Sequence, residues 1–205
     1  MISYTYVDGE YNFDNEIKKS KFITYVIGEI VENTVENKIK EIRKSHSKAT
    51  HCTYAYVVNE GKKCKCSDDG EPQGTAGKPI LSAIQSSGIV NTLVCVVRYF
   101  GGIKLGANGL VTAYNNSAVQ GLTSATKATK YLCTKTKITL SYDNFEKVQN
   151  VIKEHGKFEN IEYSEDINID CYIKQNEYDE VVSKIKEITA SKIKIVKSEN
   201  TYISL

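Results

Sequence analysis

The chain lacks the features that place a protein in a membrane or direct it to secretion. None of its apolar runs approaches the roughly 18 residues that a membrane-spanning helix needs. Its first residues, Met1 to Thr5, lack the basic and apolar regions of a secretory signal peptide. We therefore expect a cytoplasmic protein with no membrane partner.

Metal-binding and nucleophilic cysteine motifs are also sparse. The chain has six cysteines and three histidines but no C-x-x-C pair, so we expect reduced thiols. A zinc site from Cys52, Cys64, Cys66 and His51 would have to use a C-x-C, which is poor zinc spacing. A cysteine nucleophile is disfavoured because no cysteine lies in the two glycine-rich stretches described below.

Acidic residues are absent from a third of the chain. No Asp or Glu occurs between Pro72 and Tyr142, and the cations of that span are Lys78, Arg98, Lys104, Lys127, Lys130, Lys135 and Lys137. Residues 1–130 carry 16 Lys and Arg against 12 Asp and Glu, whereas residues 131–205 carry 11 against 13. An anionic partner is therefore expected to prefer the N-terminal half.

Glycine is concentrated in two stretches, residues 67–79 and 98–110, which hold seven of the 13 glycines. Glycine permits unusual dihedral angles and close approach of another group. The first stretch carries three carboxylates and the second carries Arg98 and Lys104. These stretches are the strongest indication of a site in the sequence.

The second stretch has the features of an anion site. An apolar strand ends at Arg98, glycines let backbone N–H groups converge, and a helix is expected from about Asn108. The pattern is neither a P-loop nor a dinucleotide fingerprint. The candidate binding residues are Arg98, Gly101, Gly102, Lys104 and Gly106, with Gly74, Thr75 and Lys78 from the first stretch. The alternative is structural: the glycines allow tight packing, and Arg98 ties down a loop.

The carboxylates of the first stretch have several interpretations. Asp68, Asp69 and Glu71 could hold Mg²⁺ beside a bound phosphate or sulfate. They could equally cap a helix, or pair with Arg98 and Lys104. Ser67 has no evident base partner, which disfavours a serine nucleophile.

A helix is expected after residue 33, where Asn33 and Glu36 have the spacing of a capping box. Val35, Ile39, Ile42 and His46 would share one face of it. His46 then either packs at the end of the apolar stripe or caps the helix. The alternative is functional, with His46 and His51 flanking one pocket as acid/base groups.

The C-terminal region has a different order of expected helices and strands. From about residue 137 the expected order is β-α-β-β-α-β over about 70 residues, which is typical of a ferredoxin-like domain. We expect a mixed α/β (α+β) protein with two domains, residues 1–132 and 133–205.

Several ungapped motifs resemble the YigZ/IMPACT family. They are Ser20–Ile23, Ile42–His46, Lys48–His51, Tyr54–Tyr56, the stretch from Ser67 to Pro79, and Arg98–Tyr114. The chain departs from the family pattern at Cys52-Thr53 and at Asn108, where the family usually has a small residue. Asn tolerates the left-handed conformation, so a turn can survive there.

The resemblance implies both a fold and a functional context. It implies a two-layer N-terminal domain similar to the second domain of a small-subunit ribosomal protein. It also implies a C-terminal domain similar to domain V of elongation factor G. The resemblance to eukaryotic relatives implies a translation regulator. The C-terminal region resembles that of bacterial members, so we do not expect the extra N-terminal domain of the eukaryotic ones.

Three hypotheses follow. The first is a non-enzymatic regulatory protein linked to translation, which contacts RNA, the ribosome or a ribosome-associated protein through the glycine-rich stretches; nothing indicates DNA specificity. The second is a magnesium- and phosphate-dependent enzyme acting on a small phosphorylated metabolite or nucleotide. The third is a protein scaffold in which the glycine-rich stretches are purely structural.

Overall fold

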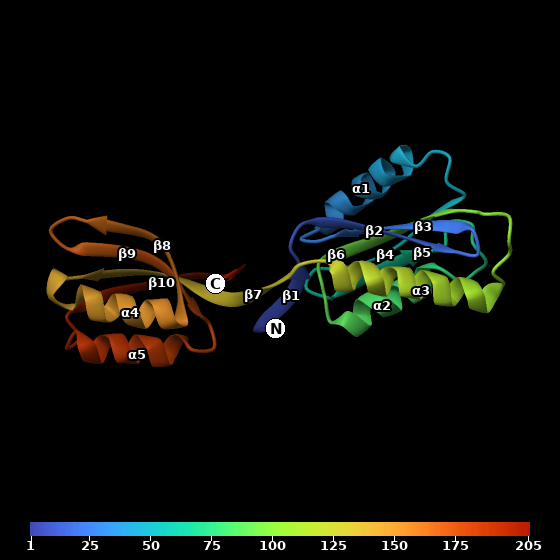
Figure 1. Ribbon diagram of the computed structural model, residues 1–205. Coiled ribbons are helices and arrows are strands. Elements are labelled where there is room, and N and C mark those ends of the chain that lie inside the picture. The colour runs from blue at the N-terminus through green and yellow to red at the C-terminus, as the bar shows by residue number, and fades with distance from the viewer. The chain divides into compact units, whose positions relative to one another are not determined.

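The computed structural model describes all 205 residues and divides into two compact units (Figure 1). One unit is Tyr4–Ala128, and the other is Thr129–Leu205 together with Met1–Ser3. The sequence predicts a division at residue 132 and does not predict that the first residues join the C-terminal unit. Met1 is hydrogen-bonded to the C-terminal unit, because the Tyr202 hydroxyl donates to the Met1 carbonyl over 2.7 Å.

The N-terminal unit contains a five-stranded sheet and three helices. In sequence its elements are β1 (Ser3–Val7), β2 (Glu10–Ile17), β3 (Ser20–Ile27), α1 (Glu32–Ser45), β4 (His51–Val58), β5 (Lys63–Ser67), α2 (Gly77–Ser87), β6 (Thr92–Tyr99) and α3 (Ala107–Ser124). The sheet has the order β2-β3-β6-β4-β5, and all its pairs are antiparallel. The apolar strand expected to end at Arg98 is confirmed as β6, the central strand.

Helices cover both faces of this sheet. The predicted stripe Val35, Ile39 and Ile42 is buried between α1 and one face. Helices α2 and α3 pack on the opposite face, where Ile80 and Tyr114 are fully buried (Figure 1). The mixed α/β class is confirmed, but the expected two-layer domain has a third layer, because α1 buries its own apolar stripe instead of leaving that face open.

Helix α3 lies close against the sheet at its small residues. Ala113, Ser117 and Gly121, which recur every four residues along α3, are buried. A Cβ added at Gly121 would lie 2.8 Å from the side chain of Thr24. This close packing holds α3 against the sheet, and the beginning of the same helix lines the site.

The C-terminal unit has the predicted ferredoxin-like order. Its elements are β7 (Lys127–Leu140), α4 (Phe145–His155), β8 (Gly156–Tyr163), β9 (Ile167–Lys174), α5 (Tyr178–Ile188) and β10 (Ile193–Ile203), with a short 3₁₀ turn at Tyr142–Asn144. Its sheet has the order β1-β7-β9-β8, with β10 also paired to β7. The pairs of β7 with β10 and β9, and of β8 with β9, are antiparallel, and α4 and α5 contribute Val148, Ile152 and Ile185 to the core. No helix of either unit is long and apolar enough to cross a membrane.

Candidate functional site

The two glycine-rich stretches meet at the end of β6 and enclose a pocket of about 450 Å³ in the N-terminal unit. Its walls combine three kinds of group: cationic or titratable side chains, apolar side chains, and the beginning of α3. The lining residues are Thr50, His51, Glu71, Pro72, Arg98, Phe100, Lys104, Leu105, Gly106, Ala107 and Leu110.

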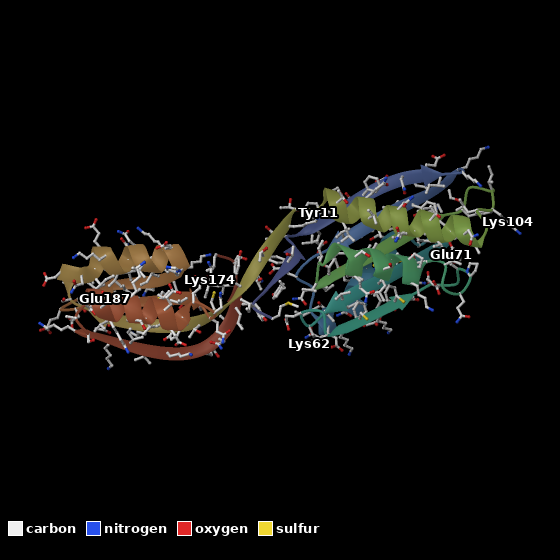
Figure 2. All side chains as sticks on the ribbon, turned by 90° about the horizontal axis from the view of Figure 1, so that it is seen from below. Tyr11, Lys62, Glu71, Lys104, Lys174 and Glu187 are labelled. Carbon is white, nitrogen blue, oxygen red and sulfur yellow. The ribbon has the colours of Figure 1, made fainter.

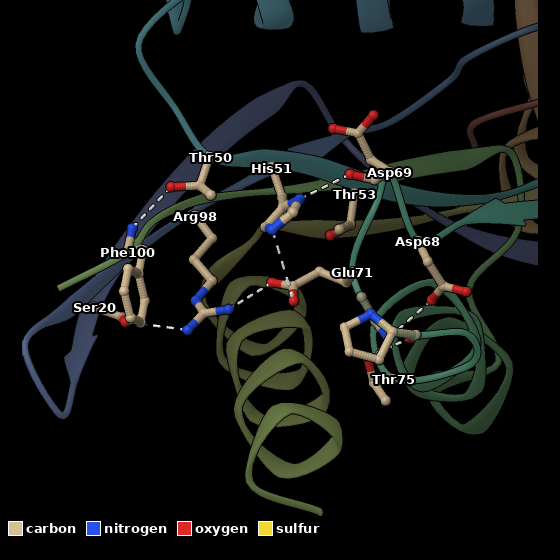
Figure 3. A network of polar contacts seen from close by, with 12 residues as sticks. Ser20, Thr50, His51, Thr53, Asp68, Asp69, Glu71, Thr75, Arg98 and Phe100 are labelled. Atoms are coloured by element: carbon tan, nitrogen blue, oxygen red, sulfur yellow. Dashed lines mark hydrogen bonds and ion pairs between the residues drawn. The ribbon is translucent and has the colours of Figure 1, made fainter. Parts of the chain in front are cut away.

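Arg98 is the central side chain of this pocket. Residues alternate between the faces of a strand, so Arg98 points to the α2/α3 side of the sheet with Val94 and Val96. Only 5% of the residue is exposed. Its Nη1 donates to Glu71 over 2.7 Å and its Nη2 to Ser20 Oγ over 3.3 Å (Figure 3). Its Nε has no hydrogen-bond partner although it is buried.

Glu71 balances the charge of Arg98 inside the protein. The same oxygen, Oε1, also accepts a 2.6 Å hydrogen bond from the Tyr114 hydroxyl. Burial, and then the Glu71 carboxylate, raise the pKa of Tyr114, so its hydroxyl stays a protonated donor. Of the alternatives for Glu71, the structure forms the ion pair with Arg98.

His51 faces the same pocket from the first residue of β4. Its Nδ1 lies 2.8 Å from the Asp69 carbonyl oxygen. A carbonyl can only accept, so Nδ1 carries a proton and the neutral ring has its lone pair on Nε2. Nε2 lies 3.8 Å from Glu71 Oε2, which is beyond hydrogen-bonding distance (Figure 3). His51 therefore has one ring nitrogen available to a ligand.

The beginning of α3 contributes backbone donors. Gly106 precedes the helix with φ at +76°, and no side chain caps its first turn. No acidic residue lies in that turn. The first N–H groups of a helix have no partner within the helix, and its N-terminus carries a partial positive charge. Lys104 adds a full positive charge beside these donors, whereas the charge of Arg98 is balanced by Glu71.

Asp68 stabilises the first stretch instead of facing a ligand. Its Oδ1 accepts from the N–H groups of Ala76 and Gly77 over 3.0 and 2.8 Å, and its Oδ2 from that of Gly74 over 2.8 Å. Burial acts to raise the pKa of Asp68, but these three donors outweigh it and hold the pKa below its usual value. Asp68 thus caps the start of α2 from a distance, which is one of the alternatives that the sequence left open.

Asp69 is held in a second structural role. Its carboxylate accepts the Cys52 N–H over 2.6 Å and pairs with Arg43. The three carboxylates therefore do not converge, and no three His, Cys, Asp or Glu side chains of the chain are placed to hold a metal ion. Burial raises the pKa of the Cys52 thiol to about 11, which keeps it protonated.

His46 lies on the other face of the sheet. Its Nε2 is 2.6 Å from the Tyr25 hydroxyl, and its Nδ1 is 2.8 Å from the Tyr99 hydroxyl. Tyr99 follows Arg98 in the strand and so points to the opposite face, toward α1. Of the two alternatives for His46, the structure shows the packed role, and the alternative in which His46 and His51 flank one pocket is wrong.

The eight residues predicted to bind a ligand are separated by the structure. Arg98, Lys104 and Gly106 line the main pocket, whereas Gly74 and Lys78 line a second hollow between α2 and α3. Thr75 is buried and donates to the Pro72 carbonyl over 2.6 Å.

Gly101 and Gly102 have structural reasons to be glycine. A Cβ on Gly101 would lie 1.8 Å from the Lys19 carbonyl oxygen, and Gly102 has φ at +86° with open space around it. The first requires a close approach of two backbones, and the second a left-handed conformation. Both allow the loop to turn back toward the pocket.

Sequence reasoning missed six lining residues: Thr50, Pro72, Phe100, Leu105, Ala107 and Leu110. Phe100 is the most informative, because 46% of it is exposed although it packs over the Arg98 guanidinium at 5.5 Å. Its signal in the sequence is a large aromatic residue directly before two glycines.

Comparisons with known proteins cover both units. The family model described as "Impact N-terminal domain" matches residues 18–122, and a domain of unknown function, DUF1949, matches residues 138–192. A crystal structure described as that of a hypothetical protein is 28% identical, covers 97% of this chain and 98% of its own, and superposes with a TM-score of 0.65.

Two bacterial relatives carry the same family name. The chain is 35% identical to the IMPACT family member YvyE of Bacillus subtilis over 91% of this chain and 87% of that protein. It is 35% identical to the IMPACT family member YigZ of Escherichia coli over 72% of this chain and 74% of that protein. The chain therefore belongs to the YigZ/IMPACT family.

Proposed function

We propose that this protein is a cytoplasmic regulatory protein linked to translation, and that it binds RNA by holding a phosphate group at the N-terminus of α3. Membership of the IMPACT family fits a translation-related regulatory role. The observation that carries the RNA contact is the pocket, where uncapped backbone N–H groups, Lys104 and Arg98 face the same space.

The charge distribution around the pocket favours an anion. The one carboxylate in its lining, Glu71, is neutralised by Arg98 at 2.7 Å. Lys104 remains as an exposed cation, and the helix terminus adds its partial positive charge. No Asp or Glu occurs from Gln73 to Ser141, so α2, β6 and α3 bring no acidic side chain near. Phosphate oxygens are the ligand that such a combination binds best.

The test is binding of single-stranded RNA by three single charge variants. Lys104→Glu removes the exposed cation, and Ala107→Glu places a carboxylate in the first turn of α3. Both are expected to weaken binding at least about tenfold at low salt and to flatten the salt dependence by about 0.7 for each phosphate group that the variant no longer neutralises. Ala107→Glu should not destabilise the helix, because a negative side chain is favourable in its first turn.

Lys62→Glu is the matched control, because Lys62 lies at the other end of the unit from Lys104 and Glu71 (Figure 2). Its side chain is 80% exposed. It should bind RNA nearly as the unaltered protein does. The proposal would be contradicted if Lys104→Glu and Ala107→Glu left the RNA affinity unchanged. It would also be contradicted if Lys62→Glu lowered the affinity as much as they do. Arg98→Glu is unsuitable, since it would place a second carboxylate against buried Glu71.

A further inference from the structure

We infer that the pocket holds one nucleoside 5′-phosphate unit, with the phosphate at the start of α3 and the base stacked on Phe100. This inference rests on the proposed phosphate site and adds the chemical class of the whole ligand. Such a unit occurs in a free nucleotide and at the 5′ end of a single-stranded RNA.

The first step of the argument is an unsatisfied donor. Arg98 Nε is the only buried side-chain nitrogen or oxygen of the chain without a hydrogen-bond partner. Buried polar groups are almost always paired, so an unpaired donor beside a pocket is a candidate partner for a ligand oxygen. The guanidinium lies between the rings of Phe22 and Phe100, at 5.6 and 5.5 Å. Phe22 is fully buried and Phe100 is 46% exposed, so Phe100 is the outer ring and lines the pocket beside Arg98.

The second step is the exposed aromatic ring. Phe100 is 46% exposed, although its backbone is tied down by a 3.0 Å hydrogen bond from its N–H to Thr50 Oγ1. An aromatic ring fixed beside a cationic site is the arrangement that single-stranded nucleic acids use for stacking. The base must be unpaired to stack on it, which excludes an intact duplex.

The third step is the division of the pocket walls. Pro72, Leu105 and Leu110 supply apolar surface, while Lys104 and the start of α3 supply the charge. A ligand must therefore be partly flat or apolar and partly anionic. The volume of about 450 Å³ lies in the range of small-molecule sites and accommodates one nucleotide instead of several.

The experiment titrates the full chain with four kinds of probe: adenosine 5′-monophosphate, adenosine, inorganic phosphate, and single-stranded RNA with a 5′-phosphate or a 5′-hydroxyl. Adenosine 5′-monophosphate should bind at least about tenfold more tightly than adenosine or phosphate. Phe100→Ala should weaken that binding about tenfold, which is the usual loss for one stacked base. It should leave the affinity for inorganic phosphate unchanged.

Two further variants separate the loss of stacking from a general loss of apolar surface. Phe100→Leu retains apolar packing over Arg98 and should also lose nucleotide affinity. Ile103→Ala removes another exposed apolar side chain of the same loop and should have no effect. The RNA probes distinguish the two sources of the ligand. If the 5′-phosphorylated RNA binds more tightly than adenosine 5′-monophosphate, the ligand is an RNA end. If that RNA binds equally or more weakly, the ligand is a free nucleotide.

The outcomes separate this inference from the proposed function. If Lys104→Glu lowers the affinity for adenosine 5′-monophosphate but Phe100→Ala and Phe100→Leu do not, the stacked base would be overturned. The proposed phosphate site would still stand. Mononucleotide affinity no greater than that of inorganic phosphate would also overturn the stacked base. No binding of RNA, nucleotide or phosphate would overturn both.

Discussion

Replacing Glu71 by glutamine is expected to lower the free energy of unfolding of the N-terminal unit by about 3–5 kcal/mol. Arg98 would remain 5% exposed with its charge no longer balanced, because Glu71 is its only acidic partner in the structure. The chain has two compact units, so amide hydrogen exchange in β6 should be measured, since it reports the N-terminal unit by itself.

Two comparisons establish that the effect comes from a buried charge. Asp14→Asn breaks the pair with Lys21, whose two side chains are about half exposed, and should change exchange very little because solvent screens such pairs. The double variant Glu71→Gln/Arg98→Met removes both charges and should be more stable than Glu71→Gln alone. If the β6 amides of Glu71→Gln and Asp14→Asn were equally protected from hydrogen exchange, Glu71 would not be needed to balance the buried charge of Arg98.

Replacing Asp68 by asparagine is expected to destabilise the same unit by about 2–3 kcal/mol near neutral pH, because three backbone donors point at this one carboxylate. An asparagine amide offers one acceptor oxygen, and its NH₂ group would face one of the donors. Urea unfolding followed by hydrogen exchange in α2 measures the loss.

The effect of Asp68 should depend on pH in a defined direction. The folded protein holds the pKa of Asp68 below its ordinary value of 3.8, so the contribution is complete above about pH 4 and is lost as the pH falls through the folded pKa. The stability difference between the unaltered protein and Asp68→Asn should therefore narrow below pH 4. A difference that stays constant from neutral to acidic pH would show that the carboxylate charge is not what the loop requires.

The sequence predicted well the features that depend on neighbours along the chain. The apolar strand expected to end at Arg98 is β6, which ends at Tyr99, and the helix expected from about Asn108 begins at Ala107. The βαββαβ order predicted the ferredoxin-like unit. The glycine-rich stretches predicted that Arg98 and Lys104 would lie near each other.

Features that depend on pairing across the sheet were harder to predict. Placing His46 away from the pocket required knowing which face Tyr99 occupies, and that follows from the register of β6 with its neighbours. The carboxylates of the first stretch looked alike in sequence, yet only Glu71 points at Arg98. The difference arises from backbone turns that involve Asp69 and Gly70, both with positive φ.

Two element boundaries differ from those that the local sequence pattern predicted. The spacing of Asn33 and Glu36 predicted a capping box, but α1 begins at Glu32 with Val31 as its N-cap and no side-chain cap. Thr34 instead donates to the Val31 carbonyl over 2.9 Å. β7 begins at Lys127, whereas the sequence predicted a strand only from about residue 137; its pairing with β10 extends back to Tyr131.

The most direct test of the central claim is a titration of the ¹⁵N-labelled protein with inorganic phosphate and then with adenosine 5′-monophosphate, observed by NMR. The account predicts shifts in the backbone amides of Ala107 to Gly109 and in the Arg98 Nε–H signal with both ligands, and in residues around Phe100 with the nucleotide. Shifts confined to other surfaces, or an Arg98 Nε–H signal that does not move, would contradict a phosphate site at the start of α3.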